Sequence, residues 1–182
     1  LEEGYGINLL PLANFAMETY GDDPCTQFLP RVEGAEDSRQ MQLMAKMHKA
    51  ISIIQFKLEG QIIARHPEYK MDDRRQLHLI DFESGKIIID GKAYEMLDSN
   101  FPTVDPKDPY ALTPAEERLM GQLHHSFTCS ERLQKHLRCL YRHGSLFLTR
   151  NNTLLYHAAV PLNDDGTFRE VVVDGASYSG RA

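Results

Sequence analysis

The longest regular pattern in the sequence lies between residues 37 and 66. Apolar side chains recur there every three or four residues, which places them on one face of a helix. Asp37 or Ser38 can cap its start, and His66-Pro67 ends it. We expect this face to fill a core, although a methionine-rich partner surface is the alternative. The apolar positions are Met44, Met47, Ile51, Ile54, Leu58 and Ile62.

The segment before this helix is expected to contain one shorter helix and a loop. Residues 5–20 combine helix-forming residues with spaced apolar side chains, and Gly21 is a typical helix-ending residue. Pro11 inside this segment weakens the pattern. Residues 21–36 are rich in proline and glycine, so we expect a loop there.

Beyond the long helix the apolar period changes from helical to extended. Residues 77–96 predict a three-stranded antiparallel meander, with a glycine in each of its two turns. Residues 98–112 contain three prolines among acids and amides, which is typical of a surface linker.

A capping box begins the next helix. Thr113 is the cap, Pro114 is the first helical residue, and Glu116 can return a hydrogen bond to the cap. A similar pattern at residues 128–131 predicts that the chain bends and begins another helix, which ends at Gly144. The expected buried stripe of this last helix is Leu133, Leu137 and Leu140.

The last third of the chain is predicted to be extended. Residues 145–156 form a β-hairpin around Asn151-Asn152, and residues 168–173 form another strand. The polar run at residues 175–182 is expected to contain neither helix nor strand. Helices come first and strands last, so the predicted fold class is α+β.

Composition narrows the range of functions. The chain has 26 acidic and 20 basic residues and a net charge of −6, with the basic residues interspersed among acids, which disfavours nucleic-acid binding. No apolar run approaches the ~20 residues of a membrane-spanning helix. Three cysteines are too few for a disulfide framework, so we expect a reducing, cytoplasmic location.

His157 is the first candidate for a metal ligand. It follows the apolar strand at residues 153–156, which we expect to be buried, and small residues follow it. A hydrogen-bonded structural histidine is the alternative interpretation. Another set of candidates could share a helix face and bind zinc, but no fourth ligand accompanies it and an ordinary amphipathic helix is favoured. That set is His136, Cys139 and His143.

Charged pairs are also candidates for chemistry. Adjacent acids are expected to be solvated loop or capping residues rather than acid/base pairs. Arg74-Arg75 and Arg138 with Arg142 are candidate phosphate or carboxylate contacts, or ordinary surface residues. The adjacent acids are Glu2-Glu3, Asp22-Asp23, Asp72-Asp73, Glu116-Glu117 and Asp164-Asp165.

Four stretches of the sequence carry a resemblance to a known family. They lie at residues 5–13, 20–25, 50–57 and 154–162, the last containing His157, and the likeness runs over essentially the whole chain. The sequence resembles the class 3, or firmicute-type, fructose-1,6-bisphosphatases, which belong to the calcineurin-like metallophosphatases.

This resemblance implies a reaction and a division of the chain. The implied reaction is two-metal hydrolysis of the 1-phosphate of fructose 1,6-bisphosphate in gluconeogenesis, with manganese as the favoured metal. Residues 1–144 would be a largely helical accessory insertion that includes the meander, and residues 145–182 part of the metallophosphatase sandwich. His157 matches the metal-ligand histidine that follows the insertion.

The resemblance also implies an internal fragment of a longer parent. The family's other metal motifs are absent from this sequence, and would lie before Leu1 and after Ala182. We therefore expect the fragment alone to be inactive, with the remainder of the parent chain as its partner. Unpaired hairpin edges could also pair with a second copy. The alternative function is a helical oligomerisation or effector-binding module without catalysis.

Overall fold

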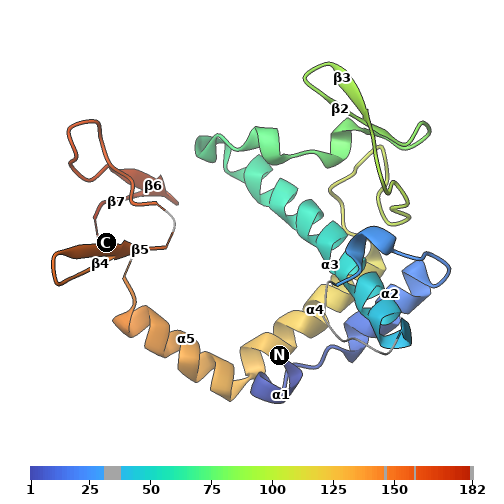
Figure 1. Cartoon of the computed structure of the whole chain (residues 1–182), viewed down its shortest axis with the longest axis horizontal. Coiled ribbons are helices and arrows are strands. Elements are labelled where there is room, and N and C mark those ends of the chain that lie inside the picture. Colours follow the sequence, from blue (N-terminus) through green and yellow to red (C-terminus); the bar gives the residue numbers. More distant parts are fainter. Residues whose placement is uncertain (31–37, 146, 158, 181–182) are drawn as a thin grey trace. The chain divides into compact units, whose positions relative to one another are not determined.

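The computed structural model describes residues 1–30, 38–145, 147–157 and 159–180 (Figure 1). The chain divides into two compact units, an N-terminal unit, Leu1–Ser130, and a C-terminal unit, Glu131–Ala182. Helices dominate the first unit, and the strands form small antiparallel sheets, which confirms the α+β class. Within the described ranges, no helix is both long enough and apolar enough to cross a membrane.

The first predicted helix is α2, Leu10–Tyr20, which ends before Gly21 as expected but begins later than residue 5. A separate short helix, α1, covers Glu2–Tyr5, so the chain breaks where a continuous helix was predicted. The break occurs because Gly6 adopts a left-handed conformation, with φ of 65°, that ends α1. Pro11 lies in the first turn of α2. Backbone N–H groups there have no helical acceptor, so the missing N–H of proline costs no helical hydrogen bond.

The long helix is confirmed as α3, Ser38–Arg65, which ends just before Pro67. Asp37, one of its two candidate caps, lies outside the described residues. α2 packs against α3 and against α4, Pro114–Cys129 (Figure 1). Their shared apolar core is formed by Leu12, Phe15, Ala16, Tyr20, Cys25, Ala45, Ala50, Ile54, Leu119 and Leu123.

The buried face of α3 differs from the predicted stripe. Ile54 is buried as expected, but Met44 and Ile62, at the two ends of the stripe, are exposed. The face that turns inward is rotated toward Ala50 and Ile53. Three lysines of α3 are buried as well, Lys46, Lys49 and Lys57.

The predicted meander is confirmed. β1, Ile80–Asp81, pairs with β2, Lys86–Ile89, which pairs with β3, Lys92–Glu95, and both pairings are antiparallel. The first strand is shorter than expected, because residues 77–79 form a 3-10 turn before it. Three further 3-10 turns join the elements of this unit, at Thr26–Phe28, Pro67–Tyr69 and Asp72–Arg74.

The linker at residues 98–112 contains no helix or strand, as predicted, but it does not simply cross the surface. Val104 and Tyr110 are buried, and the ring of Tyr110 lies directly on α3 at Gly60. A Cβ at Gly60 would lie 2.2 Å from Cδ1 of that ring. Because Gly60 has no side chain, the ring of Tyr110 can pack directly against α3, and this contact holds the linker on the helix.

The capping box is confirmed at the start of α4. The backbone N–H of Glu116 donates to Oγ1 of Thr113 at 3.2 Å, and the backbone N–H of Thr113 donates to Oε2 of Glu116 at 2.7 Å. A new helix, α5, covers Glu131–His143, so the predicted restart is also confirmed. Thr128 does not cap it, because its hydroxyl donates to the backbone carbonyl of His124 at 2.8 Å.

Two hairpins follow α5 in the C-terminal unit. β4, Phe147–Arg150, pairs with β5, Thr153–Tyr156, around the predicted Asn151-Asn152 turn, in which both residues have positive φ. β6, Val171–Val173, pairs with β7, Ala176–Tyr178. The expectation of no strand after residue 175 is wrong, because Asp174 and Gly175 also have positive φ and form a second two-residue turn.

The C-terminal unit buries none of its described residues. The leucine stripe of α5 is not buried as expected, since Leu140 remains 65% exposed. All four residues of β5 are exposed too, so the expectation that His157 follows a buried strand is wrong. The structural boundary lies at residue 130, whereas the accessory region implied by the resemblance ends at residue 144, and that functional division stays a prediction.

Candidate functional site

His157 lies at a bend immediately after β5, with its side chain exposed. Its ring makes no hydrogen bond to any described residue, so the interpretation as a hydrogen-bonded structural histidine gains no support. A neutral imidazole can bind a metal through either ring nitrogen. The described residues contain no group of three or more His, Cys, Asp or Glu side chains that could hold a metal. His157 could therefore supply at most one ligand, and the described part of the chain does not complete a metal site around it.

The other histidine candidates do not form a metal site. His136, Cys139 and His143 are exposed on α5, and they are not among any metal-binding group of the described residues. The favoured interpretation of an ordinary amphipathic helix is therefore retained.

The two arginine candidates differ in their surroundings. Arg74 pairs with Glu59 at 3.2 Å, and Arg75 pairs with Asp72 at 3.6 Å and lies over the ring of Tyr110. These two arginines act within the N-terminal unit. By contrast, Arg138 and Arg142 are exposed on α5 and make no ion pair with described residues, so they stay candidate anion contacts.

The paired acids mostly occupy turns and caps, as predicted. Oδ1 of Asp165 accepts from the backbone N–H and the hydroxyl of Thr167, at 2.9 and 2.6 Å, and Glu116 closes the capping box. Asp23 is the exception. Its carboxylate accepts a hydrogen bond from the buried ammonium of Lys49 at 2.7 Å, so it is not a solvated loop acid.

Lys49 is the centre of the first buried ion cluster. Its side chain is fully buried, and Nζ lies 2.7 Å from Oδ2 of Asp23 and 2.7 Å from Oδ2 of Asp98. Aromatic rings surround the ammonium, with centroids between 5.2 and 5.8 Å from Nζ. Those rings belong to Tyr20, Phe28 and Phe101. One cation of α3 thus joins the loop after α2 to the start of the linker.

Lys57 forms a second buried pair. Nζ lies 2.7 Å from Oε2 of Glu116, and the two side chains are 0% and 1% exposed. The same ammonium donates to the backbone carbonyl of Thr103 at 2.6 Å. Glu116 therefore serves both as the capping residue of α4 and as the counter-ion of α3.

Lys46 holds the end of α2. Its ammonium donates to the backbone carbonyls of Tyr20 at 2.7 Å and Gly21 at 2.9 Å, and also to that of Asp23. These carbonyls lie at the C-terminal end of a helix, where a cation is favoured by the helix dipole and satisfies acceptors that have no helical partner.

These lysines and their partners were missed by the sequence analysis. Each ammonium is buried and hydrogen-bonded, Lys49 and Lys57 to carboxylates and Lys46 to backbone carbonyls, so this arrangement stabilises the unit and offers no accessible base or nucleophile. The only available signal was that the three lysines share one face of α3 with its small residues, Ala50 and Gly60.

The pKa values around this cluster follow from its burial and hydrogen bonds. Burial alone would raise the pKa of Asp23, but hydrogen bonds from Lys49, from the Cys25 backbone N–H and from Asn100 outweigh it and lower the pKa to about 2. Burial, together with the negative charge of Asp23, raises the pKa of the Cys25 thiol to about 11. Cys25 is thus a neutral core residue and not a nucleophile.

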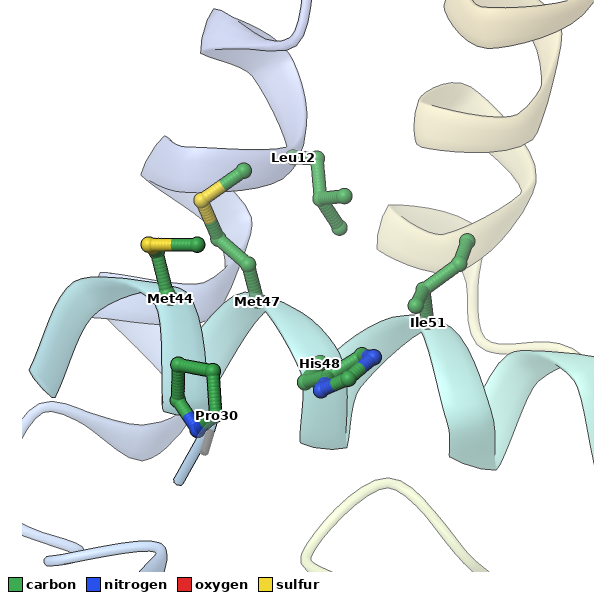
Figure 2. A pocket seen from close by; sticks show the side chains of 6 residues that line it. All are labelled: Leu12, Pro30, Met44, Met47, His48 and Ile51. Atoms are coloured by element: carbon green, nitrogen blue, oxygen red, sulfur yellow. The ribbon is translucent and has the colours of Figure 1, made fainter. Parts of the chain in front are cut away.

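An apolar groove of about 210 Å³ crosses the start of α3 (Figure 2). Met47 reaches from α3 toward α2, where Leu12 faces it, and the exposed Met44 lies beside Pro30. His48 and Ile51 complete the lining. The two methionines at the start of the predicted stripe therefore have different environments. Met47 packs against the core, whereas Met44 is exposed.

Comparison with known proteins confirms the resemblance. The family model described as firmicute fructose-1,6-bisphosphatase matches residues 1–182. Class 3 fructose-1,6-bisphosphatases from Porphyromonas gingivalis, Parabacteroides distasonis and Clostridium novyi are 59%, 56% and 55% identical to the chain. Each alignment covers 100% of this chain and 28% of the relative.

The chain thus spans 28% of the length of these curated relatives. No solved structure matches it. Because the family model covers every residue of the sequence, the chain belongs to the firmicute fructose-1,6-bisphosphatase family.

Proposed function

We propose that the chain forms part of a cytoplasmic fructose-1,6-bisphosphatase of gluconeogenesis. The reaction is hydrolysis of the 1-phosphate of fructose 1,6-bisphosphate, which yields fructose 6-phosphate and inorganic phosphate. The observation that carries the proposal is the family match over residues 1–182, supported by relatives of that name at more than half identity. Since those relatives are much longer, the other catalytic groups come from sequence that this chain does not span.

His157 is the residue of this chain that we assign to the metal centre. Two divalent cations, with manganese favoured, would when bound activate a water molecule and neutralise charge on the phosphate. His157 would hold one cation through one nitrogen of a neutral imidazole. Its other ring nitrogen would donate to a group outside the described residues, which fixes the orientation of the ring.

The isolated chain should be inactive, because one imidazole cannot hold a pair of cations. We expect no phosphate release from fructose 1,6-bisphosphate and only weak Mn²⁺ binding by calorimetry. A tight calorimetric site, or turnover by the isolated chain, would contradict this proposal.

A chimera provides the direct test of His157. The 182 residues of this chain replace the matching stretch of the Porphyromonas gingivalis relative, and phosphate release and bound manganese are measured. In this chimera His157→Ala should lose bound metal and lower kcat by at least about 100-fold, because a ligand is removed. His143→Ala, an exposed histidine of the same unit, is the matched control.

The control variant should keep both metal and turnover. Wild-type rates and metal content in His157→Ala would remove this residue from the mechanism. Circular dichroism of both variants distinguishes a lost ligand from a lost fold.

The apolar groove supports a second candidate function for the helical region, in oligomerisation or effector binding. Met44 is exposed at this groove and outside the core cluster, so Met44→Glu should leave the fold intact. If the groove is a contact surface, this substitution in the chimera changes the oligomeric state or regulation and leaves basal turnover unchanged. Unchanged assembly and regulation would reject the groove as a contact surface.

A further inference from the structure

Helix α5 has two chemically opposite sides. Its apolar stripe consists of Leu133, Leu137, Leu140 and Tyr141, and its basic stripe consists of Lys135, Arg138 and Arg142. At 100° per residue these two stripes point away from each other. A helix with this division is stable in a protein when the apolar side is covered and the charged side stays in water.

The C-terminal half of the apolar stripe is exposed, whereas Leu133 and Leu137 are partly buried. Leu140 is 65% exposed and Tyr141 is 88% exposed. Large apolar side chains each gain about 1.5–3 kcal/mol when they are fully buried. The stripe is therefore a surface with a substantial free-energy gain still available.

The neighbouring β4–β5 hairpin also has exposed apolar side chains, on both of its faces. The register pairs Leu148 with Leu155 on one face of β4–β5, and places Leu154 and Tyr156 on the other. All four side chains are exposed. A sheet that is apolar on both faces is typically covered on both, and a two-stranded hairpin alone is marginally stable in water.

The length of the relatives indicates what covers these surfaces. The alignments include all of this chain but 28% of each relative. The remaining sequence of those relatives is therefore available to cover the exposed apolar surfaces of α5 and the hairpin. α5 ends at His143 and β4 begins at Phe147, which places the apolar stripe within a few residues of the hairpin. A layer that packs on the hairpin can therefore extend over the apolar stripe.

We propose that the apolar stripe of α5 docks onto the part of the longer polypeptide that this chain does not span, and that the basic stripe stays in water. Arg138 and Arg142 make no ion pair with described residues, in agreement with a solvent-facing side. This docking concerns assembly of the polypeptide and does not depend on the proposed catalytic role of His157.

Cysteine labelling tests the proposal. Cys129 and Cys139 are exposed and are replaced by serine, whereas the buried Cys25 is kept. A reporter is then introduced as Leu140→Cys on the apolar stripe or as Arg138→Cys on the basic stripe. Maleimide labelling rates are compared between the isolated chain and the Porphyromonas gingivalis chimera described above.

The two reporters should respond differently. Leu140→Cys should be labelled at least about 10-fold more slowly in the chimera than in the isolated chain, because labelling then requires local opening. Arg138→Cys should be labelled at similar rates in both proteins. Tyr141→Cys is a second reporter on the apolar stripe, in case Leu140→Cys disturbs docking.

Three outcomes would overturn the proposal. Equal rates for the apolar-stripe reporters in both proteins would show that the sequence outside this chain does not cover the stripe. Protection that disappears when the chimera is diluted would identify a second copy as the occupant. Protection of Arg138→Cys as well would show that the basic stripe is covered. Phosphate release is measured separately, so an inactive chimera with a protected Leu140→Cys would reject the catalytic proposal alone.

Discussion

The two units differ in whether their own residues form a buried core. The N-terminal unit contains every buried residue that the structure describes, including an apolar core shared by α2, α3 and α4. The C-terminal unit has well-formed hairpins and an amphipathic helix, yet buries none of its described residues. The comparison shows that turn chemistry and helix periodicity are sufficient to define local elements, whereas a core requires apolar faces that meet.

The N-terminal unit also supports a group of buried charges that the other unit could not. An ammonium or carboxylate is stable away from water only when hydrogen bonds and counter-ions surround it on all sides. Lys49 and Lys57 meet this condition because α3 lies between the linker, the loop after α2 and α4. These buried ions therefore depend on the core that surrounds them.

The largest predicted effect comes from breaking the fully buried pair. Lys57→Met leaves the carboxylate of Glu116 buried without its cation, which should lower the free energy of unfolding by about 3–5 kcal/mol. Urea unfolding followed by circular dichroism measures this loss. The matched control is Lys86→Met, which removes an exposed pair with Glu95 and should cost less than about 1 kcal/mol. Similar losses in the two variants would show that burial of the pair has no energetic consequence.

Acid should weaken the N-terminal unit through Asp23. A carboxyl whose pKa is lowered in the folded state contributes stability above its unfolded pKa of about 3.9, and loses it as the pH falls through the folded pKa. With a folded pKa of about 2, Asp23 should contribute about 2 kcal/mol that disappears between about pH 4 and pH 2. Asp23→Asn should lack this part of the pH dependence of urea unfolding. An unchanged acid profile in Asp23→Asn would contradict the assigned pKa.

The contact of the linker with α3 gives a smaller effect. Gly60→Ala places a Cβ against the ring of Tyr110, and the resulting overpacking should cost about 1–3 kcal/mol. Gly121→Ala, in α4, meets nothing within 4 Å and should gain up to about 1 kcal/mol from helix propensity. Opposite shifts in melting temperature are expected. A destabilised Gly121→Ala, or a stabilised Gly60→Ala, would show that the Tyr110 contact is not as described.

The smallest effect should be seen in the C-terminal unit. Leu155→Ala removes an exposed side chain, so the unfolding free energy of the isolated chain should change by less than about 0.5 kcal/mol. In the chimera the same substitution should lower the melting temperature measurably, because the hairpin is then covered. A loss in the isolated chain as large as that from a core truncation would mean that this unit already has a core.

Local signals predicted much of the fold. The Thr113–Glu116 capping box, the Asn151-Asn152 turn and the long helix depend on residues close together in the sequence, and all three are confirmed. The second hairpin was missed although Asp174-Gly175 is an equally strong turn signal, because the polar residues after it hid the short β7.

The buried ions could not be predicted in the same way. A hydrophobic pattern counts lysine as polar, although its long stem can lie in a core while its ammonium finds partners. Asp98 is 49 residues from Lys49, and Glu116 is 59 residues from Lys57, so no local pattern joins them. His157 differs again, since its assignment rests on the family resemblance and its other ligands lie outside the described residues.

Hydrogen exchange of the isolated chain, resolved by peptide, tests most directly whether only the N-terminal unit has a core. Amides of α2, α3 and α4 should exchange slowly and lose their protection together in urea, because they share one core. Amides of the β4–β5 and β6–β7 hairpins should exchange at nearly unprotected rates. Protection of these hairpins equal to that of α3 would contradict the central claim, because it would show that the C-terminal unit is complete without further sequence.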